Sequence, residues 1–79
     1  MIKPKTVEEG SDLATVRALC RHGAARSIRI EAHLSLREVA SICGVTDVGV
    51  SRWERGLRVP HGAPALAYAA LLRRLSESV

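Results

Sequence analysis

The residues best suited to bind another molecule are arginines and short polar side chains within residues 47–55. At about 100° per residue, one side of a helix here carries Asp47, Val48, Ser51, Arg52 and Arg55, and the other side carries Val50, Trp53 and Leu57. The guanidinium of Arg52 can bond to both O6 and N7 of guanine, Asp47 can accept from cytosine N4, and Val48 can contact a thymine methyl group. The pattern predicts a helix that packs by its apolar side and presents its polar side to a nucleic-acid groove.

Several of these residues also have structural interpretations, which the sequence leaves open. A carboxylate in the first turn stabilises the helix dipole and is repelled by phosphates, so we favour a structural role for Asp47. Thr46 suits an N-cap, and its hydroxyl can also reach a phosphate. Val48 can be exposed by chance, and Arg52 can be a solvated or phosphate-binding residue.

The charge of the chain favours an acidic partner. Its 79 residues carry a net charge of +4, and most of the 12 basic residues are arginines, which suit phosphates and base edges better than lysines do. The pI of about 9.8 fits nucleic-acid binding, although coding bias in a GC-rich genome would enrich arginine equally. We expect phosphate contacts from Arg37, Arg55 and Arg58, with Arg37 alternatively an ordinary solvated helix residue.

The cysteines and histidines do not form a metal site. Cys20 and Cys43 lie in apolar, helix-like segments, which predicts two reduced packing thiols rather than a disulfide. His22, His33 and His61 show no zinc-ligand spacing with these cysteines. We therefore predict no bound metal.

Other classes of function find no support in the sequence. It holds no Ser–His–Asp order, phosphate-binding loop or paired-carboxylate motif, so we predict no enzyme activity, no cofactor and no small-molecule ligand. It has no run of about 18 apolar residues and no secretory signal, so we expect no membrane partner and a cytoplasmic location.

Periodicity predicts an all-α fold, a small five-helix bundle. Residues 1–10 resemble a flexible tail in composition, and residues 11–79 are expected to form one domain. Helices are expected over about 12–21, 24–33, 36–43, 47–55 and 64–77.

Two of the helix starts carry a possible capping box. Ser11 can cap the first helix, but Thr6 and Glu9 form a competing capping box that would start this helix earlier. The box formed by Ser35 and Glu38 stands before an apolar run and gives the clearest boundary in the chain.

A tight turn joins the helices expected at 36–43 and 47–55. Gly44 can adopt the left-handed conformation that such a turn needs, Ala40 permits close approach of the second helix, and Val45 can fill the corner. Two short helices joined in this way are typical of a helix-turn-helix.

Residues 34–60 resemble the phage repressor and Cro-like (XRE-type) helix-turn-helix DNA-binding family. The resemblance rests on a Leu-Ser start, an apolar-Ala pair, a Gly-Val-Thr turn, a Val-Ser pair, Trp-Glu-Arg-Gly, and a basic residue before Pro. The matching residues are Leu34, Ser35, Val39, Ala40, Gly44, Val45, Thr46, Val50, Ser51, Trp53, Glu54, Arg55, Gly56, Arg58 and Pro60.

The resemblance implies that residues 47–55 form the recognition helix, which enters the major groove by its N-terminal part. It implies base contacts for Asp47, Val48 and Arg52, with Ser51 beside them.

Three further positions follow from the resemblance. It places Ser35 near the phosphate backbone and implies an ion pair between Arg29 and Glu54, for which we expect a structural role. The family's frequent Gln at the start of the first motif helix is Leu36 here, which puts the contacts of that Gln in doubt.

These features predict a sequence-specific regulator of transcription that binds double-stranded DNA, a Cro-type phage or bacterial repressor that occupies an operator. The family also implies a homodimer on a pseudo-palindromic operator with half-sites about 34–36 Å apart. Two alternatives stay open: a protein-interaction module, antitoxin-like or anti-repressor, and an architectural factor in recombination. DNA affinity that falls linearly with salt on logarithmic scales would count against the interaction module.

Overall fold

The computed structural model describes residues 6–77 and folds them into helices, with no β-strand among these residues. The helices are α1 (Val7–Arg21), α2 (Ala24–Glu31), α3 (Leu36–Cys43), α4 (Asp47–Glu54) and α5 (Gly62–Glu77). The prediction of an all-α, five-helix bundle is confirmed.

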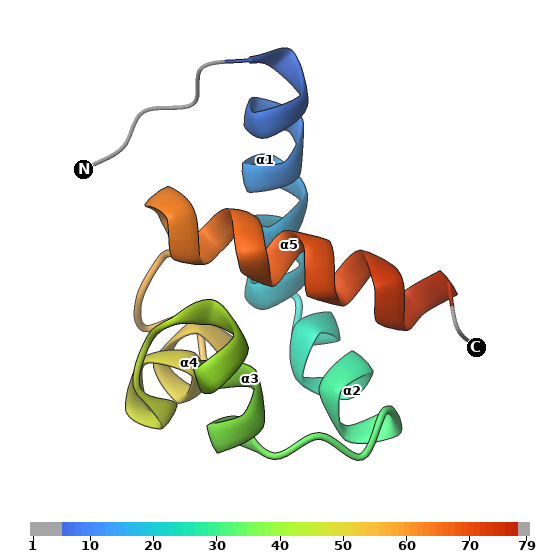
Figure 1. Cartoon of the computed structure of the whole chain (residues 1–79), viewed down its shortest axis with the longest axis vertical. Helices are drawn as coiled ribbons and strands as arrows, with labels where there is room; N and C mark the ends of the chain where they lie inside the picture. Colours follow the sequence, from blue (N-terminus) through green and yellow to red (C-terminus); the bar gives the residue numbers. More distant parts are fainter. Residues whose placement is uncertain (1–5, 78–79) are drawn as a thin grey trace.

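The long helix α5 crosses the molecule in front of α1, with α3 and α4 below one half of it and α2 below the other (Figure 1). Its inner side packs Tyr68, Ala69 and Leu72 into the core. Each other helix adds buried apolar residues to the same core, among them Val16 of α1, Ala25 of α2, Val39 of α3 and Val50 of α4. One continuous core therefore fixes α4 relative to the rest of the bundle.

Local capping signals explain where α3 and α4 begin. The hydroxyl of Ser35 accepts from the backbone N–H of Glu38 at 3.0 Å, and the Glu38 carboxylate accepts from the N–H of Ser35 at 2.8 Å. The hydroxyl of Thr46 caps α4 by accepting from the N–H of Gly49 at 3.1 Å. Both predicted starts are correct because each cap satisfies an N–H that a helix leaves unpaired.

The start of α1 differs from the expectation of a tail over residues 1–10. Thr6 is the N-cap and accepts from the N–H of Glu9 at 3.0 Å, so the helix begins at Val7 rather than near residue 12. Thr6 prevails over Ser11 as the N-cap, and its hydroxyl satisfies one of the N–H groups that the first turn leaves unpaired. Residues 1–5, with the two lysines of the expected tail, lie outside the described residues.

The end of α2 comes two residues earlier than predicted. His33 has a φ of 59°, in the left-handed region. Its N–H bonds to the carbonyl of Ile30, and the N–H of Leu34 bonds to the carbonyl of Arg29. This pair of bonds forms a Schellman motif, which ends a helix and more often uses glycine at the left-handed position.

A similar motif after α4 overturns the expected placement of Leu57. Gly56 has a φ of 73°, its N–H bonds to the carbonyl of Trp53, and the chain turns away. Leu57 is consequently 64% exposed and does not lie with Val50 and Trp53 on the buried side. The helix ends at Glu54 and not at residue 55, and α5 begins at Gly62, two residues before Pro64.

The two cysteines are free, buried packing residues, as predicted. Burial raises the pKa of Cys20 to about 11 and that of Cys43 also to about 11. The reactive thiolate is therefore scarce at neutral pH. No helix in the described part of the chain has the length and hydropathy needed to cross a membrane.

Candidate nucleic-acid interface

Helices α3 and α4 meet at a short turn that sets their relative orientation. Gly44 has a φ of 74°, and the N–H of Val45 bonds to the carbonyl of Ala40 at 3.0 Å. Ala40 is buried in the core, and Val45 packs against the same core. Small residues and one left-handed glycine thus bring two short helices together as a helix-turn-helix.

The inner side of α4 is anchored by apolar packing. Val50 is fully buried and Trp53 is 7% exposed. The rings of Trp53 and Tyr68 lie with centroids 4.9 Å apart at an interplanar angle of 31°, which joins α4 to α5. Trp53 is therefore a core residue, and its packing fixes the position of α4 and so of the exposed outer side of this helix.

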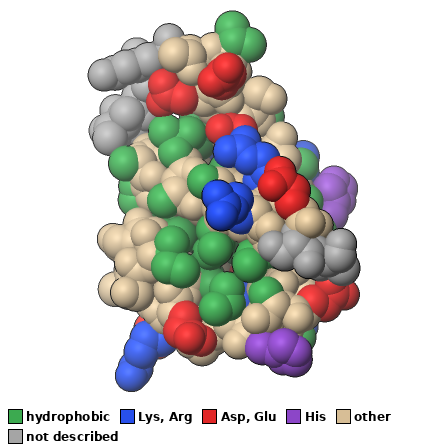
Figure 2. Space-filling model, turned by 45° about the vertical axis from the view of Figure 1, so that its right-hand side comes forward, with side chains coloured by type: hydrophobic (Ala, Val, Ile, Leu, Met, Phe, Trp, Pro, Cys, Tyr) green, Lys and Arg blue, Asp and Glu red, His purple; other side chains and the backbone are tan. Residues whose placement is uncertain are grey.

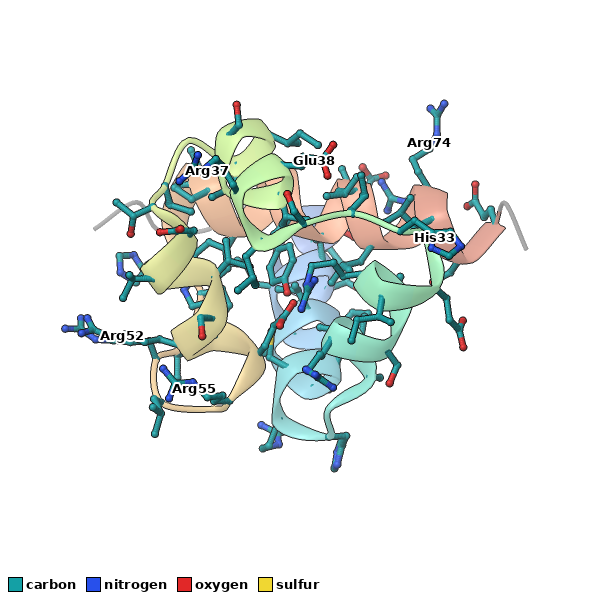
Figure 3. The ribbon with its side chains drawn as sticks, turned by 90° about the horizontal axis from the view of Figure 1, so that it is seen from below. His33, Arg37, Glu38, Arg52, Arg55 and Arg74 are labelled. Atoms are coloured by element: carbon teal, nitrogen blue, oxygen red, sulfur yellow. The ribbon has the colours of Figure 1, made fainter. Side chains whose placement is uncertain are left out.

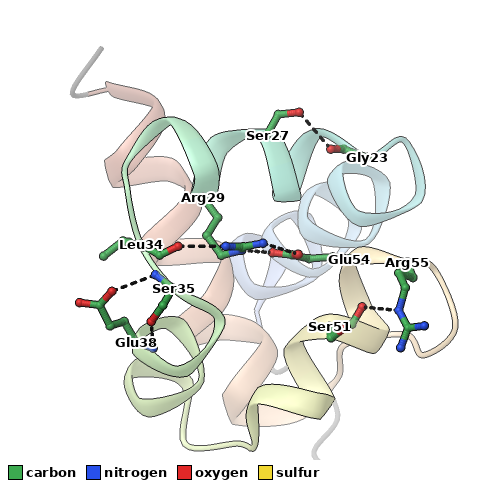
Figure 4. Close-up of polar contacts among 9 residues, drawn as sticks. All are labelled: Gly23, Ser27, Arg29, Leu34, Ser35, Glu38, Ser51, Glu54 and Arg55. Carbon is green, nitrogen blue, oxygen red and sulfur yellow. Dashed lines mark hydrogen bonds and ion pairs between the residues drawn. The ribbon is translucent and has the colours of Figure 1, made fainter.

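A buried ion pair adds a second anchor between α2 and α4 (Figure 4). Arg29 Nε donates to Glu54 Oε2 at 2.5 Å and its Nη2 donates to Oε1 at 3.0 Å, a bidentate arrangement. A third guanidinium nitrogen donates to the carbonyl of Leu34 at 3.0 Å. The hydrogen bond with Glu54 raises the pKa of Arg29, so the cation is favoured in this position. The pair that the resemblance implies is present.

The outer side of α4 carries the predicted base-reading residues. Arg52 is exposed, Val48 is 51% exposed, and Ser51 is half-buried. Asp47 is exposed, and its Oδ1 accepts from the N–H of Val48 at 2.8 Å. The Asp47 carboxylate thus satisfies an N–H in the first turn of the helix. Arg52, in contrast, extends away from the bundle (Figure 3).

The predicted phosphate-binding arginines border this surface. Arg37, Arg52 and Arg55 lie on the same side of the molecule, whereas His33 and Arg74 lie at the opposite end (Figure 3). Arg55 Nε donates to the carbonyl of Ser51 at 3.4 Å, which keeps its guanidinium near α4. Positive side chains of α3 and α4 therefore flank the exposed side of α4.

The two hydroxyl-bearing residues that were predicted to contact the DNA backbone also cap helices. Ser35 and Thr46 each accept a backbone N–H at the start of their helices. Both residues are exposed, so each hydroxyl oxygen can still donate its proton to a phosphate. Arg58 is also exposed and lies in the loop after α4.

One contact near this surface escapes sequence reasoning. Arg17 Nε of α1 donates to the carbonyl of Pro60 at 3.1 Å and pins the loop that follows α4. A hollow of about 300 Å³ lies between this loop and α4, with Arg52 and Arg58 among its lining residues. No local pattern connects residue 17 with residue 60, so only the fold reveals this contact.

The model of the helix-turn-helix family matches residues 26–78, which spans nearly all of α2 and the whole of α3, α4 and α5. None of the curated proteins and none of the solved structures matched the chain. The chain belongs to the XRE-type helix-turn-helix family. That family binds DNA and is not an enzymatic one, so the protein is a DNA-binding regulator of the XRE type.

Replacing Gly49 with alanine is expected to stabilise the protein by about 0.8–1.0 kcal/mol, because glycine is a poor helix former. An added Cβ would meet only the Thr46 hydroxyl at 3.4 Å and the Cβ of Val45 at 3.9 Å, which are ordinary contacts. Urea unfolding followed by tryptophan fluorescence measures the change. A destabilised variant would contradict the prediction. A more stable variant with weaker DNA binding would indicate that the duplex approaches the backbone at this position.

Proposed function

We propose that the protein is a sequence-specific regulator of transcription that represses by occupying a double-stranded DNA operator, in the manner of a Cro-type phage or bacterial repressor. The observation that supports this proposal best is the outer side of α4. It exposes Arg52 and Val48 on a helix that the core and a buried ion pair hold from behind. Such a regulator would act on DNA in the bacterial cytoplasm or nucleoid.

In this proposal α4 enters the major groove by its N-terminal part. Arg52 reads guanine through two hydrogen bonds, and Val48 contacts a thymine methyl group. Ser51 lies beside them as a secondary contact. Asp47 contributes to the first turn more than to the bases, because its carboxylate already accepts the N–H of Val48.

The duplex backbone would be held on both sides of α4. Arg37 on the α3 side and Arg55 and Arg58 on the other neutralise phosphates, while the hydroxyls of Ser35 and Thr46 donate to phosphate oxygens. Each neutralised phosphate releases counterions, so binding weakens as salt increases.

We also propose that the protein binds its operator as a homodimer. The described chain measures 32 × 26 × 21 Å, so two copies fit side by side at a half-site spacing of about 34–36 Å. Hydrophobic side chains gather on a face that includes α5 (Figure 2), and Ala67 and Leu71 of α5 are only partly buried. An operator occupied by such a dimer would exclude polymerase from an overlapping promoter.

Selection of bound sites from random duplexes tests this proposal directly. We expect enrichment of a palindromic motif with two half-sites one helical turn apart. On the selected site, log affinity should fall linearly with log salt. An unenriched pool with salt-insensitive or absent binding would favour a protein-interaction module, antitoxin-like or anti-repressor. Strong, salt-dependent binding without enrichment would favour an architectural or recombination factor.

A further inference from the structure

A small cleft lies between the C-terminal end of α1 and the loop that follows α4. Its volume is about 140 Å³, and its lining residues are Arg17, Cys20, Arg21, Gly56, Arg58, Val59 and Pro60. Figure 3 shows the loop after α4 beside the end of α1, on the side of the molecule where Arg55 lies. The cleft therefore lies beside the loop that leaves α4, on the side of the molecule where Arg55 lies.

The cleft gathers positive charge without a neutralising acid. Three of its lining residues are arginines and none is Asp or Glu. Arg17 donates to the carbonyl of Pro60, which leaves its charge uncompensated. Within residues 6–77, Arg21 and Arg58 have no acidic partner, whereas Arg29 pairs with Glu54 and Arg73 with Asp12. Uncompensated guanidinium groups around one cleft favour an anion, and their fork of N–H donors suits phosphate.

The cleft extends beyond the segment that the family model matches. The family model matches residues 26–78, so Arg17 and Arg21 lie outside the matched segment. Arg58 and Pro60 belong to the loop that leaves the recognition helix. Because Arg17 ties this loop to α1, the backbone of a DNA strand that runs past α4 and along the loop would next reach Arg21.

We infer that Arg21 and Arg58 bind a backbone phosphate of the duplex just outside the bases that α4 reads, with Arg17 positioning the loop between them. This inference rests on the proposed function. It extends the DNA contact surface to a helix that the family match does not include. The contact carries no base information, so it raises affinity equally for all sequences.

The test compares Arg21→Gln with the wild-type protein on the selected operator between about 50 and 200 mM salt. Each subunit of the dimer loses one phosphate contact, so the slope of log affinity against log salt should become shallower by about 1.8, and the affinity advantage of wild type should shrink about 12-fold over this range. Specificity between operator and mutated sites should stay unchanged. Arg21→Lys keeps the charge and should retain a slope near that of wild type.

Arg74→Gln is the matched control, since it removes the same charge at the end of the molecule opposite Arg52 and Arg55 (Figure 3). Circular dichroism verifies that all variants are folded. Phosphate-ethylation interference should show one phosphate flanking each half-site at which ethylation weakens binding of wild type more than binding of Arg21→Gln, in which only Arg58 still contacts it.

The outcomes separate this inference from the proposed function. If the wild-type protein binds its operator and Arg21→Gln keeps the wild-type slope and interference pattern, the inference is wrong and the proposed function stands. An equal loss in Arg74→Gln would also overturn it, because the effect would then reflect net charge alone. If the wild type binds no duplex, both the proposed function and the inference fail.

Discussion

Replacing Glu54 with alanine is expected to lower the free energy of unfolding by about 3–5 kcal/mol, the usual cost of leaving one charge of a buried pair without its partner. The Glu54 side chain is 4% exposed and that of Arg29 is 12% exposed. Without Glu54, the guanidinium of Arg29 keeps its charge and a single carbonyl acceptor, that of Leu34. For a chain of this length the total stability is only about 4–12 kcal/mol, so the variant should be partly unfolded at 37 °C.

Urea denaturation followed by the fluorescence of Trp53 measures this loss. Asp12→Ala is the matched control, because the Asp12–Arg73 pair has 33% and 58% exposed side chains and should contribute no more than about 1 kcal/mol. The double replacement of Arg29 by Met and Glu54 by Leu should recover much of the stability, since no lone charge remains. A cost for Glu54→Ala no larger than that for Asp12→Ala would refute a structural role for the pair.

The second large effect is expected at Arg52, where replacement by alanine should relax specificity at one guanine of each half-site. A bidentate contact between arginine and guanine discriminates by about 1–3 kcal/mol, which corresponds to about 5- to 150-fold in relative affinity. The side chain is exposed and extends from the outer side of α4, so its removal should leave folding intact.

The measurement compares operators with each base pair of the half-site replaced in turn. For Arg52→Ala, one position should lose its preference while the others keep theirs. Arg55→Ala provides the contrast, because loss of a phosphate contact weakens binding to every operator equally and makes the salt slope shallower by about one for each subunit bound. If Arg52→Ala behaves as Arg55→Ala does, Arg52 binds the backbone and reads no base.

The helix-turn-helix could be predicted from the sequence because short-range interactions define its helix ends and its turn. The capping residues Ser35 and Thr46 and the left-handed Gly44 act over three or four residues, so their signals are complete in the sequence. The buried side of α4 also follows from helical spacing, as Val50 and Trp53 show. The overall pattern of α3, turn and α4 therefore needed no structure.

The errors arise where competing local signals or distant contacts decide the outcome. Two capping signals compete for the start of α1, and the sequence does not rank Thr6 above Ser11. His33 takes a left-handed conformation that glycine usually provides, so its role as a helix terminator has no clear sequence signal. The contact of Arg17 with Pro60 spans 43 residues and depends on how α1 packs beside the loop.

The packing of α1 has a consequence for where this protein begins as a folding unit. The segment matched by the family starts at residue 26, yet Leu13, Val16 and Cys20 of α1 are buried. A fragment cut at the family boundary would leave part of Tyr68 and Leu72 facing water, and we expect it to aggregate rather than fold. Helix α1 thus closes one side of the core, and we expect the smallest autonomously folding form of this regulator to be longer than the segment that the family model matches.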